Sequence, residues 1–289
     1  MTKPKRDEAA NEKSIREFES LLDSGYGENP VQSFLESHAE LIPTPFLLNH
    51  SLHLLSVVSK LRLTQDLITD FVYLTKSSSS WQCCLVEIED PQKRIFTNDL
   101  ERVVFHSDFN KALGQLDSWK CFVDGGGADQ ILQSLAPLMK VMPNNRVHFK
   151  YALVYGRRAE MHGNQDRINR WDQISNEDRR VVTFDSLISG LQHANFPMKK
   201  SILTKRLKGF QLKRLNGVMT PLFASISNHE LYIDDDTEKE LLRMGYSMKS
   251  WRNGKLLTSN HKYAPGDPGD LKFLRGLKAA AKKARQKNR

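Results

Sequence analysis

Three carboxylates stand out because they interrupt apolar runs of the sequence. Asp70 lies in the segment ITDFVYL, and Glu87 and Glu89 lie in the segment CCLVEIEDP. Carboxylates that gather in apolar surroundings repel one another unless a cation lies among them, and such hard oxygen ligands suit Mg²⁺ or Mn²⁺. The three residues are therefore candidate ligands of a divalent metal ion.

Two predicted strands position these side chains, over residues 68–74 and 81–89. Alternate residues of a strand point to opposite faces, so Glu87 and Glu89 share one face. The connecting segment KSSSS is long enough for a hairpin and too short for a crossover helix, so antiparallel pairing is expected. This pairing brings Asp70 to the same end of the hairpin as the two glutamates.

The order of the remaining elements predicts a mixed α/β sheet flanked by helices. A strand over 54–63 completes a three-stranded antiparallel unit with the hairpin. Further strands are expected over 146–155 and 181–184. The expected helices cover residues 15–22, 31–41, 98–104, 108–123, 128–140 and 165–174, and a last one begins at Asp185 as its N-cap.

Two of these helices offer further candidate site residues. Glu36 and Glu40 share one side of the helix over 31–41, and an ordinary solvated pair is the plain alternative to a metal or water ligand. Lys111 and Gln115 share one side of the helix over 108–123 in the same way.

The composition is that of a globular protein with basic clusters. The 289 residues carry a formal net charge of +9, with 39% hydrophobic and 27% charged residues. Residues 272–289 hold eight basic side chains and no acidic one, and residues 199–214 hold seven. Such clusters favour DNA through counterion release, although a solubilising surface explains each equally well. The candidate DNA contacts here are Lys205, Arg206, Lys282 and Lys283.

Membrane insertion and secretion are not expected. No segment reaches the roughly 20 apolar residues needed to cross a bilayer, and the stretch MTKPKRDEAANEK lacks the apolar part of a secretory signal. The three cysteines, including the adjacent Cys83 and Cys84, have neither a disulfide framework nor the spacing of a metal site. The expected location is the cytoplasm.

Six segments, in this order and spacing, resemble the catalytic domain of the Shedu family of prokaryotic anti-phage nucleases, within the PD-(D/E)XK superfamily. They are QSFLESHAELI, ITDFVYL, CLVEIEDP, KALGQLDSW, YALVYGRR and VVTFDSLI, and they fall within residues 31–191. The resemblance implies a PD-(D/E)XK nuclease core, Mg²⁺-dependent cleavage of DNA, defence against phage and homo-oligomerisation.

The resemblance also assigns roles to individual residues. Asp70 matches the Asp of the motif, and Glu87 matches its Glu. Gln115 matches a helix Gln that would hold the metal site or the scissile strand. Glu36 matches the Glu of the first core helix and becomes a fourth candidate metal ligand.

Arg157 and Arg158 follow Gly156 at the end of a predicted strand. Glycine lets the backbone approach a phosphate, and arginine forms forked bonds to it, so the segment suits DNA contact. It also matches a Gly-Arg-Arg segment of the family, for which we expect phosphate or subunit contact. Two ordinary surface arginines are the alternative.

Glu89 departs from the motif, which has a lysine at this position. That lysine would stabilise negative charge in the transition state and help to lower the pKa of the attacking water. Three interpretations are open. Glu89 binds a second metal ion or acts as general base, as in restriction endonucleases with a similar Glu-x-Glu; Lys111 replaces the lysine; or the site is inactive.

The expected function is a metal-dependent DNA endonuclease that hydrolyses phosphodiester bonds by metal-activated water. Mg²⁺ or Mn²⁺ is the expected cofactor, with no small-molecule cofactor, and DNA and further copies of the chain are the expected partners. The alternative is a catalytically degenerate nuclease fold that binds DNA or senses DNA ends.

Four segments are expected along the chain. Residues 1–28 form a helix with a disordered start, and residues 29–192 form the nuclease-like domain. Residues 193–270 form a small α+β appendage of unassigned role, with a hairpin turn at Asn216 and Gly217. Residues 271–289 form a basic tail.

Overall fold

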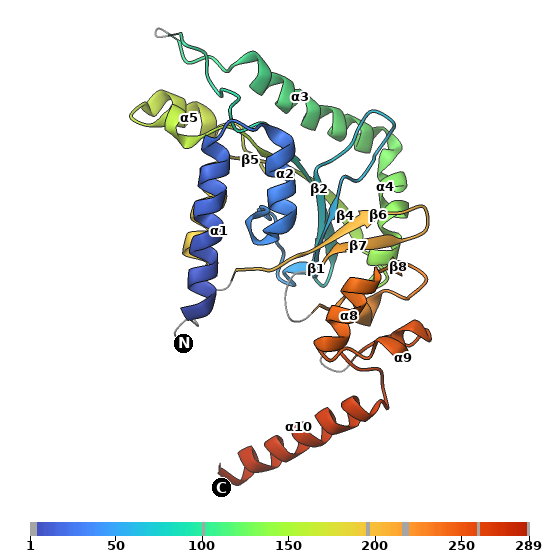
Figure 1. Cartoon of the computed structure of the whole chain (residues 1–289). Helices are drawn as coiled ribbons and strands as arrows, with labels where there is room; N and C mark the ends of the chain where they lie inside the picture. The colour runs from blue at the N-terminus through green and yellow to red at the C-terminus, as the bar shows by residue number, and fades with distance from the viewer. Residues whose placement is uncertain (1–4, 100–101, 195–196, 216–219, 259–260, 288–289) are drawn as a thin grey trace.

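One mixed sheet of eight strands runs through the computed structural model, which describes residues 5–99, 102–194, 197–215, 220–258 and 261–287 (Figure 1). The strand order is β5-β4-β3-β2-β1-β6-β7-β8. The expected α/β fold with a mixed sheet is confirmed. The strands are β1 (Leu52–Ser59), β2 (Phe71–Lys76), β3 (Ser80–Ile88), β4 (Arg146–Val154), β5 (Arg179–Val182), β6 (Ser201–Lys205), β7 (Phe210–Arg214) and β8 (Leu231–Tyr232).

The centre of the sheet is the antiparallel unit expected from the sequence. β2 pairs antiparallel with both β1 and β3, and β4 and β5 then add in parallel. Phe71 faces Val86 across the hairpin, and the Asp70 N–H donates to the Val86 carbonyl at 3.1 Å. The register therefore places Asp70 opposite Glu87.

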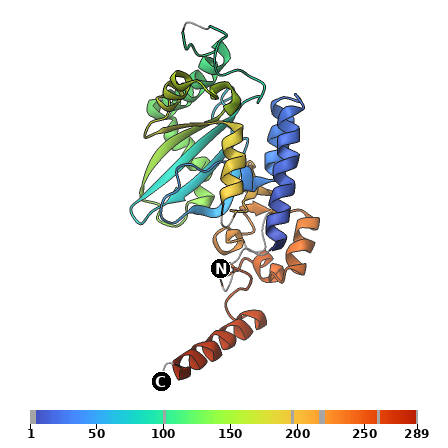
Figure 2. The same ribbon diagram turned by 90° about the vertical axis from the view of Figure 1, so that its left-hand side faces the viewer.

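Helices cover both faces of the sheet (Figures 1 and 2). α1 (Lys5–Asp23), α2 (Glu28–Ser37) and α6 (Phe184–His193) enclose one apolar core, which contains Tyr73 and Val86. α3 (Ser107–Phe122) and α4 (Ala128–Leu135) enclose the other, which contains Val72 and Leu85. Alternate side chains of β2 and β3 thus lie in two separate cores. α1 begins at Lys5, within the stretch expected to be disordered.

The segment expected as a C-terminal appendage extends the same sheet. β6 pairs in parallel with β1, with Ser56 opposite Ser201. β6 and β7 form a hairpin closed by the Arg206 N–H and the Gly209 carbonyl at 3.0 Å. The expected turn at Asn216 and Gly217 lies outside the described residues.

Four short helices and one long one complete the described part of the chain, and the last, long helix extends away from the body of the molecule (Figure 1). They are α5 (Gln165–Asp172), α7 (Leu222–Ser225), α8 (Asp235–Arg243), α9 (Met248–Arg252) and α10 (Pro268–Lys287). Within the described residues, none of the helices combines the length and the apolar character that crossing a bilayer requires.

The prediction of a short helix over residues 98–104 is wrong for the described part of that segment. Phe96 and Phe105 form an isolated antiparallel bridge and stack with ring centroids 5.2 Å apart. The Glu160 carboxylate accepts hydrogen bonds from the N–H groups of Ile95 and Phe96. A side chain distant in the sequence therefore satisfies the N–H groups of an extended backbone. Local helix signals in the sequence do not reveal such a partner. Leu100 and Glu101 lie outside the described residues.

The expected N-cap role of Asp185 was also wrong. Thr183 is the N-cap residue of α6. The Asp185 carboxylate instead accepts hydrogen bonds from the Arg157 side chain and from the Arg158 N–H. A tertiary ion pair therefore takes the place of the local cap.

Candidate functional site

The carboxylates predicted from the sequence meet at one end of the β2–β3 hairpin, on the face of the sheet that α3 covers. Asp70, Glu87 and Glu89 are all buried, with 3%, 8% and 8% of their surface exposed. Burial raises the pKa of Glu87, and the charges of Asp70 and Glu89 raise it further. Pairing of two strands at this register puts three acidic side chains in one buried cluster.

Asp70 is held by both of its oxygens. The Ile88 N–H donates to Oδ2 at 2.6 Å, and the Lys60 ammonium contacts Oδ1. Burial raises the pKa of Asp70, while Lys60 acts in the opposite direction. Lys60 follows β1 directly, and its own N–H donates to the Asp70 carbonyl at 2.9 Å.

Glu87 is the carboxylate of the cluster whose burial is least offset by hydrogen bonds or by a contact with a lysine. Gln115 of α3 donates a hydrogen bond from Nε2 to Glu87 Oε1 at 2.5 Å. Glu87 Oε2 is buried and has no hydrogen-bond partner among the described residues. Burial, together with the charges of Asp70, Glu89 and Glu28, raises the pKa of Glu87 to about 10. The cluster therefore lacks positive charge at Glu87.

Glu89 and Glu28 complete the acidic cluster. The Lys93 ammonium, four residues after Glu89, contacts Glu89 Oε2. Glu28 lies in the first turn of α2, and burial together with Asp70 and Glu89 raises its pKa. The site thus holds four carboxylates and two lysines.

The sequence analysis missed Glu28, Lys60 and Lys93. The strand expected over 54–63 contains Lys60. The antiparallel register of that strand against Asp70 was the signal that could have identified Lys60. No comparable local signal marks Glu28, since its approach to the cluster depends on how α2 packs against the sheet.

Glu36, the acidic residue of α2 expected at the site, is engaged elsewhere. Ser59 Oγ contacts Glu36 Oε1, and the Lys213 ammonium donates to Oε2 at 2.6 Å. Glu36 therefore connects α2 with β1 and β7. Its carboxylate is not free to turn toward Asp70 without breaking these contacts.

The two candidates on α3 have different surroundings. Gln115 reaches Glu87 through a hydrogen bond. The Lys111 ammonium donates to Asp108 Oδ1 at 2.9 Å, and 78% of the Lys111 side chain is exposed. In this arrangement Lys111 pairs within its own helix rather than with the carboxylate cluster.

The arginines after β4 also differ from each other. Arg157 donates to Asp23 of α1 at 2.7 Å and to Asp185 of α6 at 3.1 Å. The Arg158 N–H donates to Asp185 Oδ2 at 2.6 Å, and the Arg158 side chain is exposed. Arg157 therefore bridges α1 and α6, whereas the Arg158 guanidinium faces solvent.

The basic residues of the C-terminal part are spread over two elements. Lys205 and Arg206 lie at the β6–β7 turn, where the Lys205 ammonium lies 5.2 Å from the centroid of the Phe210 ring and Arg206 contacts Gln211. Lys282 and Lys283 are exposed on α10. These elements present positive charge at separate places on the surface.

Comparison with known protein families identifies the part of the chain that carries this cluster. A family model described as Shedu protein SduA, C-terminal, matches residues 25–188. The chain belongs to the Shedu family. The resemblance to the Shedu family is thereby confirmed, and the matched range includes Glu28, Asp70, Glu87 and Gln115. No curated protein sequence matches the chain at a significant level.

The acidic cluster offers the oxygen donors that a divalent metal ion prefers, although two of its carboxylates contact lysines. In the described part of the chain, no group of three or more His, Cys, Asp or Glu side chains is arranged to hold a metal ion. Asp70 and Glu89 instead contact Lys60 and Lys93. The buried, unpartnered oxygen of Glu87 and the set of carboxylate donors nevertheless fit Mg²⁺ or Mn²⁺. Such an ion would supply the positive charge missing there.

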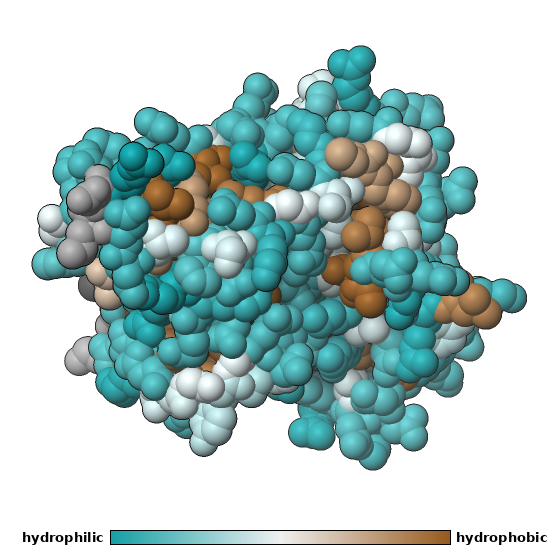
Figure 3. Space-filling view, turned by 90° about the horizontal axis from the view of Figure 1, so that it is seen from above, coloured by the Kyte–Doolittle hydropathy of each residue, from teal (hydrophilic) through white to brown (hydrophobic). Residues whose placement is uncertain are grey.

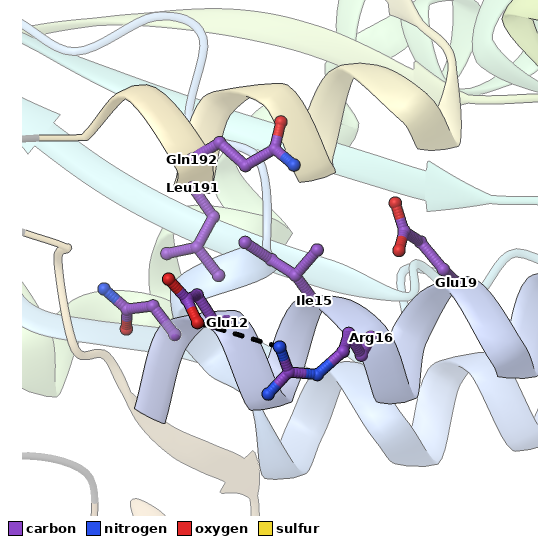
Figure 4. A pocket seen from close by; sticks show the side chains of 7 residues that line it. Glu12, Ile15, Arg16, Glu19, Leu191 and Gln192 are labelled. Atoms are coloured by element: carbon purple, nitrogen blue, oxygen red, sulfur yellow. Dashed lines mark ion pairs between the residues drawn. The ribbon is translucent and has the colours of Figure 1, made fainter. Parts of the chain in front are cut away.

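The groove between α1 and α6 of this Shedu chain is a separate feature (Figure 4). It has a volume of about 460 Å³, and α1 and α6 cover the face of the sheet opposite α3. Its charged groups include Glu12 and Arg16, an exposed pair 3.7 Å apart. This is an ordinary helix surface, so the acidic cluster is the better candidate for chemistry.

Proposed function

We propose that this Shedu-family chain is a metal-dependent DNA endonuclease that acts in defence against phage. The observation that carries the proposal is the environment of Glu87. Its carboxylate is buried beside Asp70 and Glu89, Gln115 fixes one oxygen, and the other has no partner among the described residues. A purely structural site would gain stability by replacing such a group, because uncompensated buried charge is costly.

Asp70 and Glu87 are the proposed metal ligands. The Ile88 N–H and Gln115 orient them before any ion arrives. A bound Mg²⁺ or Mn²⁺ would stabilise charge on the phosphoryl group and lower the pKa of water. Glu89 is placed to act as a further ligand or as the acceptor of a proton, once its contact with Lys93 is released.

DNA is the proposed substrate, and further copies of this chain are proposed partners. Membership of the Shedu family supports the defence role. The exposed lysines of α10 and the exposed Arg158 offer cations to the phosphate backbone. Seen from above, the surface is mostly hydrophilic, with separate apolar patches (Figure 3).

The experiment is cleavage of supercoiled and linear DNA with Mg²⁺ or Mn²⁺. We expect the native chain to cut and Asp70→Asn to lose at least about 100-fold in rate, because it removes a charged ligand. Asp66→Asn is the matched control, since Asp66 lies exposed in the loop before β2. Equal cleavage by the native chain and Asp70→Asn would contradict the proposal.

A degenerate DNA-binding module is the second candidate function. It is favoured by the contacts of Lys60 and Lys93, which neutralise two of the carboxylates without a metal ion. A module of this kind would bind DNA with steep salt dependence, before and after Asp70→Asn, and would cut no form of DNA with either metal.

A further inference from the structure

Lys60 lies beside the acidic cluster, directly after β1, where the nuclease motif has no lysine. Ser59 faces Phe71 in the β1–β2 ladder, so the next pair is Lys60 with Asp70. In the β2–β3 ladder, Asp70 is in turn opposite Glu87. One row across three neighbouring strands therefore contains a lysine, an aspartate and a glutamate.

We propose that Lys60 supplies, from β1, the positive charge that Glu89 removes from the motif position on β3. The inference rests on the proposed nuclease function and adds a catalytic residue to it. Attack on phosphorus increases the negative charge on the non-bridging oxygens. An ammonium placed there stabilises the transition state more than the bound substrate, which raises the rate of cleavage.

The geometry around Asp70 allows Lys60 to change partner. Asp70 Oδ2 is held by the Ile88 N–H, so the aspartate keeps its orientation when the ammonium leaves Oδ1. The Lys60 side chain is 44% exposed, so a phosphate arriving from solvent can reach it. The role is electrostatic: the ammonium keeps its proton throughout, and no bond to nitrogen forms or breaks.

The backbone at Lys60 has an unusual conformation. Its φ is 50°, in the left-handed region that residues other than glycine and asparagine seldom adopt. The Lys60 N–H is nevertheless bonded to the Asp70 carbonyl, so the strand end is fixed. Strained backbone of this kind is concentrated at functional sites.

Two other lysines are less suited to this role. Lys93 lies in the loop after β3 and contacts Glu89, at the margin of the cluster. Lys111 donates to Asp108 and is mostly exposed. Lys60 instead contacts Asp70, one of the two proposed metal ligands.

The test compares single-turnover DNA cleavage and Mn²⁺ binding in the full chain. We expect Lys60→Met and Lys60→Asn to cut about 100-fold more slowly, the loss typical of one transition-state donor. Asparagine readily adopts the left-handed backbone conformation, so Lys60→Asn should fold even where Lys60→Met does not. Calorimetry should show Mn²⁺ affinity unchanged or tighter, and Lys60→Arg should retain part of the rate. Lys76→Met, at the other end of β2, should remain within threefold of the native rate.

Two outcomes would overturn the inference. One is cleavage by both Lys60 variants within threefold of the native chain. The other is loss of Mn²⁺ affinity in parallel with cleavage, which would mean that Lys60 only orients Asp70. If the native chain cuts and Glu87→Gln does not, either outcome refutes the role of Lys60 alone. A native chain that cuts no DNA refutes the nuclease function, and the role of Lys60 with it.

Discussion

Among the described residues, the acidic cluster and Lys200 are two places where charge is buried, and the surroundings compensate the buried charge differently in each. In the acidic cluster, Glu87 keeps a buried oxygen without a partner among the described residues. On the other face of the sheet, the ammonium of Lys200, just before β6, donates to the carbonyls of Ala39 and Ile42, both at 2.9 Å, and of Glu40 at 3.3 Å. All three of its N–H groups have acceptors.

This difference separates Lys200, a charge with a structural role, from the acidic cluster, the proposed catalytic site. Lys200 is 2% exposed, and its carbonyl partners come from the turn after α2, so it joins β6 to the N-terminal helices. Its hydrogen bonds offset part of the cost of burial. The acidic cluster has no comparable compensation at Glu87. Under the proposed function, a bound cation would supply the missing partner of Glu87.

The largest effect that we expect is that of Glu87→Gln on cleavage. The rate should fall by about 1,000-fold or more, because the change removes a charged metal ligand. Thermal stability should stay equal or rise, since a pKa of about 10 keeps Glu87 neutral at pH 7 and glutamine is a close neutral replacement for the protonated acid. Rate measurements and melting curves on the same samples check both parts. Loss of stability together with rate would place Glu87 in the same structural class as Lys200.

The second prediction concerns the pH dependence of stability at Lys200. Burial lowers the pKa of Lys200 to about 7, below its value in the unfolded chain. The unfolded chain therefore binds more protons between pH 7 and about 10, and the free energy of unfolding should rise with pH, by at most about 1.4 kcal/mol per unit from this group.

Denaturant unfolding at several pH values measures this slope. Lys200→Met should reduce the slope over that range relative to the native chain, because methionine binds no proton. Identical slopes in the two proteins would show that the carbonyls keep Lys200 charged, and the contrast with the acidic cluster would then rest on hydrogen bonding alone.

A smaller effect is expected for Lys93→Met on metal affinity. The Lys93 ammonium competes with a metal ion for Glu89, so its removal should tighten Mn²⁺ binding about twofold to fivefold, the range of a partly exposed ion pair. Calorimetric titration measures the change, and Lys76→Met serves as the control. Weaker binding would mean that Lys93 organises the cluster instead of competing for it.

The smallest effect should come from Arg157→Ala. The ion pairs with Asp23 and Asp185 are partly exposed, so we expect a loss of about 1 kcal/mol in the free energy of unfolding. DNA affinity should change little, whereas Arg158→Ala should weaken it. Filter binding at several salt concentrations distinguishes the two. A drop in affinity for Arg157→Ala alone would reverse their roles.

The sequence by itself determined the central hairpin and the meeting of Asp70, Glu87 and Glu89. Period-two alternation and a short polar connection fix the register of neighbouring strands, so the side chains that share a face follow from local pattern. The same locality explains why the helix over 108–123 and its Gln115 were expected in the right place.

Only the tertiary structure decided which other groups reach the cluster. Glu28, and not Glu36, approaches it because α2 packs on the sheet with its first turn near the hairpin end. Glu160 holds the backbone at Phe96 in an extended form across 64 residues of sequence. Lys60 faces Asp70 because β1 pairs beside β2. These contacts join segments distant in the chain, and no local propensity encodes their distance or direction.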